Sequence, residues 1–274
     1  MRDFIEVNGV SLRYELTGPG LTGSGLTGPG LTGSGAPTLV LLHEMGGTLE
    51  TWDHVAPCFS EVQVVRYDMR GAGLSEKIRQ LSLDDLVDDL AALLTSLGIG
   101  GPLVMAGVAV GAAVGVRYAA RHPDRVAKLL LMAPATGIPA DRREATTALA
   151  REIEAGGLRQ RVVSRLPATF PEAFIGDGKR LRSSRGRALA NDPVSYGAYY
   201  RMLLDLDLTP DLRHVTCPTL VLAGTLDSTR PPERVSRDTS IMADARFEPV
   251  VSGHVMPMLT PEIVIDRLRS MLAP

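Results

Sequence analysis

Apolar and polar residues alternate along the chain in two patterns, one of short continuous runs and one of longer helical stretches. Six runs are almost entirely apolar, as expected for strands that are buried on both faces of a sheet. They cover residues 38–42, 62–67, 103–106, 126–132, 219–223 and 247–251. Helical patterns follow several of them, such as the leucine-rich stretch that begins after Ser82 and ends at Leu97. This alternation predicts an α/β fold with a doubly wound, mostly parallel sheet.

The first 16 residues carry a hairpin signal. Residues 4–7 and 11–16 alternate apolar and polar positions on either side of Asn8-Gly9. Asn-Gly is a favoured two-residue turn between antiparallel strands. We therefore expect an antiparallel pair of strands at one edge of the sheet.

Residues 16–35 consist of four near-copies of one pentapeptide, LTGPG, LTGSG, LTGPG and LTGSG. Glycine and proline disfavour both helix and strand, and one leucine in five residues cannot form a core. Lengthening a loop from about 5 to about 20 residues costs only about 1.2 kcal/mol of closure free energy. We interpret the repeat as an expanded surface loop, the alternative being a binding role.

Residues 137–208 lack strand-like runs. The pattern predicts short helices broken at Gly156-Gly157, Pro167, Pro171, Gly176–178 and Pro193. We interpret this segment as a helical cap or lid inserted into a core made of residues 1–136 and 209–274. Basic residues outnumber acidic ones in its first part, residues 137–187: Arg142, Arg143, Arg151, Arg159, Arg161, Arg165, Lys179, Arg180, Arg182, Arg185 and Arg187 against Asp141, Glu144, Glu152, Glu154, Glu172 and Asp177. These charges are either solvated faces or a source of one or two arginines that bind an anionic substrate.

Composition and charge indicate which partners, cofactors and cellular location to expect for this protein. The 274 residues have a formal net charge of −2 and a hydrophobic content of 45%, which gives no electrostatic case for nucleic acid or membrane partners. The two cysteines, Cys58 and Cys217, have no metal-ligand or redox spacing, and the amino terminus has no apolar leader. We therefore expect a cytoplasmic protein without metal or organic cofactor. Its oligomeric state is not readable from the sequence.

The strongest functional signal is the stretch at residues 103–118, LVMAGVAVGAAVGVRY. It predicts a buried strand over 103–106, a tight turn from Gly107 to Gly111, and a helix that ends near His122. A strand that turns at once into a helix through G-x-x-x-G is the setting of the nucleophile elbow, whose usual pattern is G-x-S-x-G. Here the central position is Ala109, which has no nucleophilic atom.

Further candidate groups follow other predicted strands. Loops at residues 43–47 and 68–75 follow two of them, and Asp227 and His254 follow the last two. Because the carboxyl ends of parallel strands share one edge, where ligands bind, these groups should meet there. The chain order of elbow, Asp and His is the order found in α/β-hydrolases.

The sequence thus resembles the α/β-hydrolase family, and most closely its esterase and lactonase branch with the 3-oxoadipate enol-lactonases. The motifs that carry the resemblance are H-x-x-G at 43–46 followed by W-D at 52–53, D-x-R-G-x-G-x-S at 68–75, the elbow at 107–111, A-A-R-H-P-D-R-V at 119–126, G-x-x-D at 224–227 and S-G-H at 252–254. They span nearly the whole chain outside the repeat and the helical segment. The resemblance implies a small-molecule ester or lactone as substrate, and the basic bias of the helical segment suggests that the substrate carries a carboxylate.

The resemblance also implies roles for individual residues. His254 would be the general base, and Asp227 would orient its imidazole and stabilise the imidazolium. The backbone N–H groups of Met45 and Val110 would form the oxyanion hole.

Other residues near these motifs have weaker cases. Glu44 departs from the glycine usual after the histidine in this family. It is a possible pocket residue, although we favour a solvated loop carboxylate. His43 and Trp52 are possible pocket residues, although His43 has a structural interpretation too, and Trp52 belongs either to the pocket wall on the next helix or to the core. Ser75 is expected to stabilise its turn rather than to replace the nucleophile.

Ala109 leaves three interpretations open. The chain could be a serine hydrolase whose nucleophile is replaced by alanine, by design or by nature. It could be an enzyme that naturally lacks the serine and uses the His254–Asp227 dyad as a general base, to activate water or for a lyase or isomerase step. It could also be a non-catalytic protein that binds a ligand in the old pocket.

Overall fold

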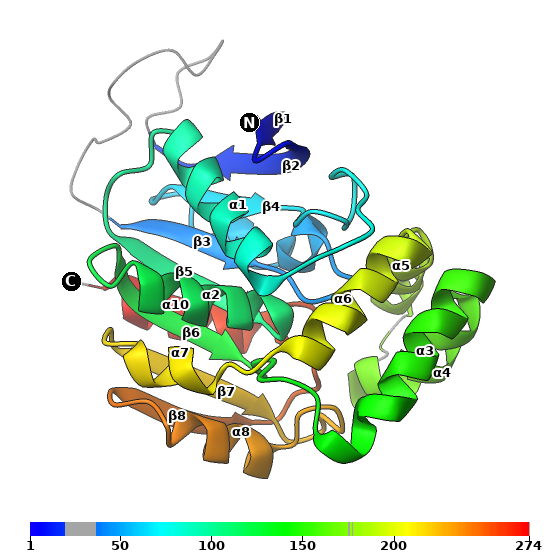
Figure 1. The fold of residues 1–274 in the computed structure, drawn as a ribbon. Helices are drawn as coiled ribbons and strands as arrows, with labels where there is room; N and C mark the ends of the chain where they lie inside the picture. The colour runs from blue at the N-terminus through cyan, green and yellow to red at the C-terminus, as the bar shows by residue number, and fades with distance from the viewer. Residues whose placement is uncertain (20–36, 175, 177, 274) are drawn as a thin grey trace.

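The computed structural model describes residues 1–19, 37–174, 176 and 178–273. Its centre is an eight-stranded sheet with the order β1-β2-β4-β3-β5-β6-β7-β8 (Figure 1). The strands are β1 (Arg2–Val7), β2 (Val10–Thr17), β3 (Thr38–Leu42), β4 (Val64–Tyr67), β5 (Leu103–Val108), β6 (Val126–Met132), β7 (Thr219–Gly224) and β8 (Ala245–Val250). From β4 to β8 neighbouring strands are parallel, whereas β1 pairs with β2, and β2 with β4, in antiparallel fashion. The predicted doubly wound, mostly parallel sheet is confirmed.

Both faces of the sheet are covered because its central strands are apolar at every position. In β3, Val40 and Leu42 face one apolar core and Leu39 and Leu41 face the other. The first core includes the helices α1 (Leu83–Ser96), α2 (Val110–Arg121) and α8 (Pro232–Thr239), and α7 (Thr209–His214) packs beside α2. The second includes η1 (Leu49–Trp52) and α10 (Pro261–Leu272), on the opposite side of the sheet (Figure 1).

Several local predictions are confirmed. The hairpin turns at Asn8 and Gly9, whose φ angles are 48° and 74°. Ser82 caps α1 with a reciprocal pair of hydrogen bonds to Asp85, a capping box. The repeat at residues 16–35 lies mostly outside the described residues.

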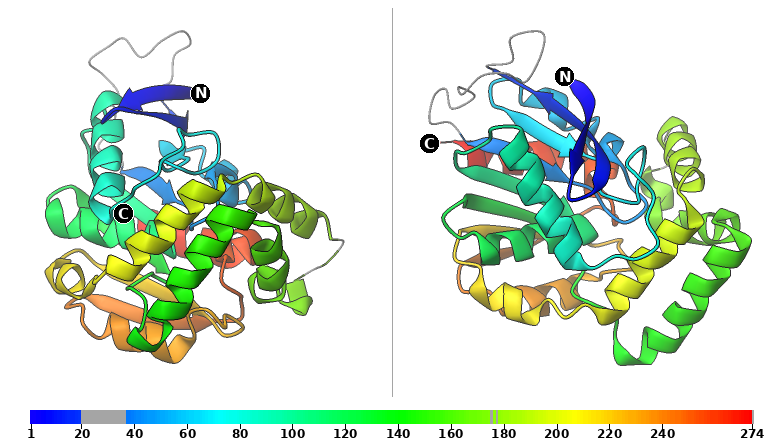
Figure 2. Two further views of the ribbon diagram at one scale, coloured as in Figure 1. Left: turned by 45° about the vertical axis from the view of Figure 1, so that its right-hand side comes forward. Right: turned by 45° about the horizontal axis from the view of Figure 1, so that its top comes forward.

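A helical insertion follows β6. It contains η3 (Ala140–Arg142), α3 (Arg143–Gly156), α4 (Arg159–Thr169), η4 (Glu172–Phe174), α5 (Lys179–Leu189) and α6 (Pro193–Asp205). Helix α3 packs on α6, and α4 contacts α5. Figures 1 and 2 show these helices beside the edge of the sheet toward which the parallel strands point. Their arrangement places them over the region where ligands bind in such sheets.

Local details differ from the predictions. Strands β4 and β8 cover Val64–Tyr67 and Ala245–Val250 rather than residues 62–67 and 247–251. Pro167 lies inside α4 rather than ending a helix, because it is near the last turn and removes a single backbone donor there. Trp52 ends the short 3₁₀ helix η1, so it is not on an α-helix with Asp53. Strand β5 continues to Val108, two residues into the expected turn. The short helix α9 (Met256–Leu259) was not predicted.

Candidate active site

The turn between β5 and α2 holds Ala109 in a strained backbone conformation. Its φ and ψ angles are 49° and −106°, a region that costs a non-glycine residue of order 1–3 kcal/mol. The Ala109 N–H donates to the carbonyl of Met132 at 2.9 Å, and its own carbonyl accepts from Ala113 and Ala135. The surrounding strands and helix therefore impose the conformation, although the side chain is only a methyl group.

Two glycines flank this turn because backbone segments approach closely there. A Cβ on Gly107 would lie 2.5 Å from the backbone of Gly111 and Ala112, and a Cβ on Gly111 would lie 2.4 Å from the Leu42 carbonyl oxygen. The geometry of a nucleophile elbow is thus complete, apart from the reactive side-chain atom.

His254 and Asp227 form a hydrogen-bonded pair at the ends of β8 and β7. The His254 Nδ1 lies 2.7 Å from Asp227 Oδ2, and the other carboxylate oxygen accepts from the N–H groups of Thr229 and Arg230 at 2.7 and 3.1 Å. Asp227 is 3% exposed. Burial alone would raise the pKa of Asp227, but its hydrogen bonds to His254 and to the two backbone N–H groups lower it below the ordinary value. An ionised Asp227 therefore holds the proton on Nδ1 and leaves Nε2 of His254 as the basic nitrogen.

The expected oxyanion donors, Met45 and Val110, lie on the same cavity as Ala109 and His254. Val110 is the first residue of α2, and backbone N–H groups in the first turn of a helix have no acceptor within the helix. The positive end of the helix dipole adds to the attraction of this position for negative charge. Gly46, with a φ angle of 80°, gives the loop after Met45 its sharp turn.

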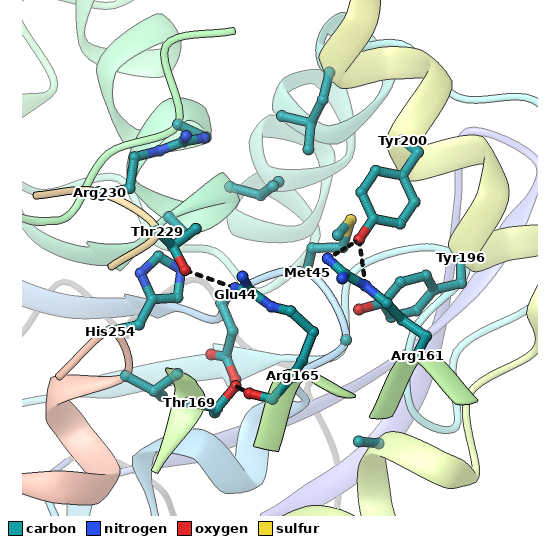
Figure 3. A pocket seen from close by; sticks show the side chains of 18 of the residues that line it. Glu44, Met45, Arg161, Arg165, Thr169, Tyr196, Tyr200, Thr229, Arg230 and His254 are labelled. Atoms are coloured by element: carbon teal, nitrogen blue, oxygen red, sulfur yellow. Dashed lines mark hydrogen bonds between the residues drawn. The ribbon is translucent and has the colours of Figure 1, made fainter. Parts of the chain in front are cut away.

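This cavity has a volume of about 660 Å³. It lies between the carboxyl edge of the sheet and the helical insertion, and Figure 3 shows side chains from both. Ala109, Met45, Val110 and His254 come from the core, and Arg161, Arg165, Tyr196 and Tyr200 come from α4 and α6.

Glu44 differs from the prediction. It lines the cavity, and both of its carboxylate oxygens accept from the Thr51 hydroxyl, at 3.1 and 3.2 Å. The expected solvated loop carboxylate is therefore wrong, because the side chain folds back over Gly47, whose missing Cβ would lie 2.5 Å from it. Figure 3 shows Glu44 among the cavity side chains.

His43 and Trp52, the two other possible pocket residues, are fully buried and are not among the residues that line the cavity. His43 Nδ1 donates to the Glu44 carbonyl at 2.7 Å while Nε2 accepts from the Met69 N–H at 3.0 Å. Both ring nitrogens are thus used in holding the loop. Trp52 packs in the core on the α10 side of the sheet.

Ser75 stabilises its turn, as predicted. Its hydroxyl donates to the Asp68 carbonyl at 2.6 Å and accepts from the Arg13 N–H at 2.9 Å. The side chain is 1% exposed, so it is not available as a replacement nucleophile.

Two of the basic residues named from the sequence in residues 137–208, Arg161 and Arg165, line the cavity, whereas Arg230, Arg234, Tyr196 and Tyr200 were not singled out. Arg161 donates to the Tyr200 hydroxyl at 2.6 and 2.9 Å, and Arg165 reaches from the insertion to the Thr229 hydroxyl at 2.7 Å (Figure 3). Arg230 and Arg234 line the cavity from the core side. The only sequence feature that could have pointed to Arg230 and Arg234 is that Arg230 lies three residues after Asp227. No sequence feature pointed to Tyr196 or Tyr200.

Among the described residues, no group of three or more His, Cys, Asp or Glu side chains is arranged to hold a metal ion. The described part of the chain also has no helix that is long and apolar enough to cross a membrane.

Known proteins resemble this chain in sequence. A family model described as serine aminopeptidase, S33, matches residues 35–246. The 3-oxoadipate enol-lactonase 1 of Acinetobacter baylyi is 26% identical over 237 residues, which cover 84% of this chain and 86% of that protein. The pyrrolizixenacetamide deacetylase of Xenorhabdus hominickii is 26% identical over 86% of this chain and 91% of its own.

Solved structures resemble it in fold. A thermophilic esterase from Thermogutta terrifontis, described with malate bound, superposes with a TM-score of 0.85 at 25% identity, covering 99% of this chain and 98% of its own. The enol-lactonase from Burkholderia xenovorans gives the same TM-score at 24% identity, over 98% and 99% of the two chains. The lactonases and the esterase among these relatives are, by their names, hydrolases of lactones and carboxylic esters, in agreement with the sequence prediction. Since the family model covers most of its length, the chain belongs to the α/β-hydrolase family described as serine aminopeptidase, S33.

Proposed function

We propose that the cavity binds a small carboxylic ester or lactone that carries a negative charge, with its carbonyl group between the elbow and His254. The observation that carries this proposal is the 2.7 Å bond between His254 and Asp227 beside a complete elbow turn. The Met45 and Val110 N–H groups are the proposed donors to the carbonyl oxygen. The arginines on the cavity wall support the charge of the substrate, and the helical insertion would act as the lid over it.

The alanine limits the chemistry. In a serine enzyme the hydroxyl oxygen attacks the carbonyl carbon, His254 takes the hydroxyl proton, and the leaving alkoxide receives that proton from the imidazolium. A methyl group cannot form the acyl-enzyme, and loss of the serine typically costs on the order of 10⁶ in rate. We therefore propose that this chain binds its ester without the covalent step, and that a serine at position 109 is all that hydrolysis requires.

A second candidate function uses the His254–Asp227 pair without a nucleophile. His254 Nε2 would take a proton from water while the resulting hydroxide bonds to the carbonyl carbon, and the same proton would pass to the leaving alkoxide. The observation that favours it is the lowered pKa of Asp227, which keeps the carboxylate ionised and so supports an imidazolium. A lyase or isomerase step would use the same base, and a binding protein would use the cavity alone.

Steady-state hydrolysis of p-nitrophenyl acetate and of small lactones separates these functions. Activity in the Ala109→Ser variant that is absent from the parent chain supports the proposal. Activity in the parent chain that disappears in His254→Ala supports the second candidate. Turnover by neither, together with saturable binding of an ester, leaves the binding protein. Equal turnover of neutral and anionic esters by the serine variant would contradict the proposed substrate charge.

A further inference from the structure

Seven arginines line the cavity: Arg142, Arg161, Arg165, Arg185, Arg187, Arg230 and Arg234. We call four of them, Arg161, Arg165, Arg230 and Arg234, the arginine row. Arg161 and Arg165 come from α4 of the insertion, and Arg230 and Arg234 come from the segment that leads into α8 and from α8 itself. Within each pair, the two arginines are four positions apart in the sequence. Figure 3 shows Arg161 beside Tyr200, Arg165 near Thr229, and Arg230 beyond it. The row thus extends from the insertion to the core, along the side of the cavity that contains His254.

The hydrogen bonds of this row go to neutral oxygens. Arg161 donates to the Tyr200 hydroxyl, Arg165 to the Thr229 hydroxyl, and Arg234 to the Gly137 carbonyl at 3.0 Å. Arg230 is only 8% exposed, and its Nε has no hydrogen-bond partner among the described residues. Within the described part of the chain, no carboxylate lies within 4.0 Å of any of these four guanidinium groups.

The four charges act on one another. Burial and the charge of Arg161 lower the pKa of Arg165. Burial and the charge of Arg234 lower the pKa of Arg230 to about 10, and Arg165 contributes in the same direction. The acidic groups that oppose these shifts are already engaged, because Asp227 bonds His254 and Asp238 accepts from the Thr136 hydroxyl at 2.8 Å.

A buried charge without a counter-charge destabilises the folded protein. Guanidinium groups bind carboxylates through two parallel hydrogen bonds, so an anion supplied from outside would restore the missing partners. The four guanidinium groups of the row carry more positive charge than a single bound carboxylate would neutralise.

We propose that the row is a specificity site for two separate anionic groups, one at Arg161 and Arg165 and one at Arg230 and Arg234, so that the substrate is a small ester or lactone with two carboxylates. This inference rests on the proposed function in taking the cavity as the substrate site, and it adds the number of anionic groups on the substrate. It predicts that dianions with separated charges bind far better than monoanions.

Calorimetric titration of the parent chain tests this with simple anions that need no turnover. The probes are L-malate, with two carboxylates, L-lactate, with one, and inorganic phosphate, whose charges sit on one group. We expect malate to bind at least about tenfold more tightly than lactate or phosphate, since one more charge-assisted pair contributes about that factor. Equal affinity for malate and lactate, or phosphate binding as tightly as malate, would overturn the proposal.

Variants locate the site. Arg230→Met and Arg161→Met should each weaken malate binding about tenfold, whereas Arg159→Met, which removes an exposed arginine of the same helix α4 outside the cavity, should leave it unchanged. Arg230→Met should also raise the melting temperature of the unliganded protein by about 2 °C or more, because an unpaired buried charge is replaced by an apolar side chain. A lower melting temperature with unchanged malate binding would assign Arg230 a structural role instead. Because binding needs no catalysis, failure of Ala109→Ser to hydrolyse esters would leave this result standing.

Discussion

Buried arginines occur in two regions of this molecule, and their surroundings are opposite. Beside strands β2 and β4, Arg13 forms ion pairs with Glu50 at 2.7 Å and Asp68 at 3.2 Å, and Arg70 donates to both carboxylate oxygens of Asp89. In the cavity, Arg165 and Arg230 have no such partner among the described residues. The arginines of the first region have carboxylate partners within the chain, and those of the second have none among the described residues.

The pKa values of these arginines shift in opposite directions. The bidentate bond to Asp89 raises the pKa of Arg70 although burial lowers it, whereas burial and neighbouring arginines lower the pKa of Arg165 and Arg230. Buried charges that are paired are compatible with a stable fold, whereas unpaired ones destabilise it. We therefore interpret the first region as structural and the second as a ligand site.

The largest expected effect concerns the paired region. Asp89→Asn should lower the free energy of unfolding by about 3–5 kcal/mol, because it removes the bidentate partner of the buried Arg70 and leaves only the longer contact to the exposed Asp85, at 3.7 Å. The neighbouring Asp88→Asn is a matched control on α1, since Asp88 is exposed and its ion pair with Arg121 is long, at 3.4 Å. It should cost less than about 1 kcal/mol. Urea denaturation measures both, and similar losses in the two variants would show that the Arg70–Asp89 pair is not structural.

A smaller effect depends on pH. Burial raises the pKa of Glu50, but the Thr48 hydroxyl, together with the hydrogen bond and charge of Arg13, lowers it, and the net value is about 2, against an ordinary value of 4.5. A lowered carboxyl pKa stabilises the folded state above the unfolded value, and this contribution is lost as pH falls through the folded value. Glu50→Gln should therefore cost about 1–2 kcal/mol at pH 7, allowing for solvent screening of a half-buried group.

The stability difference between the parent chain and Glu50→Gln should begin to shrink near pH 4.5 and close toward pH 2. Denaturant titrations at several pH values measure it. A difference that stays constant over this range would mean that the Glu50 charge does not stabilise the folded protein.

The smallest effect concerns the repeat that follows β2, the strand that carries Arg13. If ion pairs rather than the repeat stabilise this region, deleting residues 21–35 should have a small effect. The free energy of unfolding should change by no more than about 1.2 kcal/mol, the closure cost of the added length. Thermal melting compares the two chains. A large drop in melting temperature would show that the repeat contributes to the fold.

Much of the core could be predicted from the sequence because its rules are local. A strand buried on both faces must be apolar at every position, as in β3 and β5, and the elbow requires Gly107 and Gly111 wherever a strand and a helix approach so closely. The Asp227–His254 pair follows from two loops that leave the same edge of the sheet.

The cavity wall could not be predicted in the same way. Arg165 and Thr229 are 64 positions apart and meet only because the insertion folds over the sheet edge. The orientation of Glu44 depends on the space that Gly47 leaves open, which a sequence pattern does not reveal. Pro167 shows the same limit for a helix boundary, since packing can keep a proline inside the last turn.

We propose that the candidate active site lacks only one oxygen atom of a serine hydrolase, at position 109. Intact-mass spectrometry after exposure to diisopropyl fluorophosphate tests it most directly, because a serine oxygen activated by His254 bonds to phosphorus, fluoride leaves, and the hydroxyl proton passes to the imidazole. We expect the Ala109→Ser variant to gain one phosphoryl adduct at residue 109, the Ala109→Ser/His254→Ala variant to react far more slowly, and the parent chain to remain unmodified. A folded Ala109→Ser variant that stays unlabelled, or a parent chain that is labelled, would contradict the account.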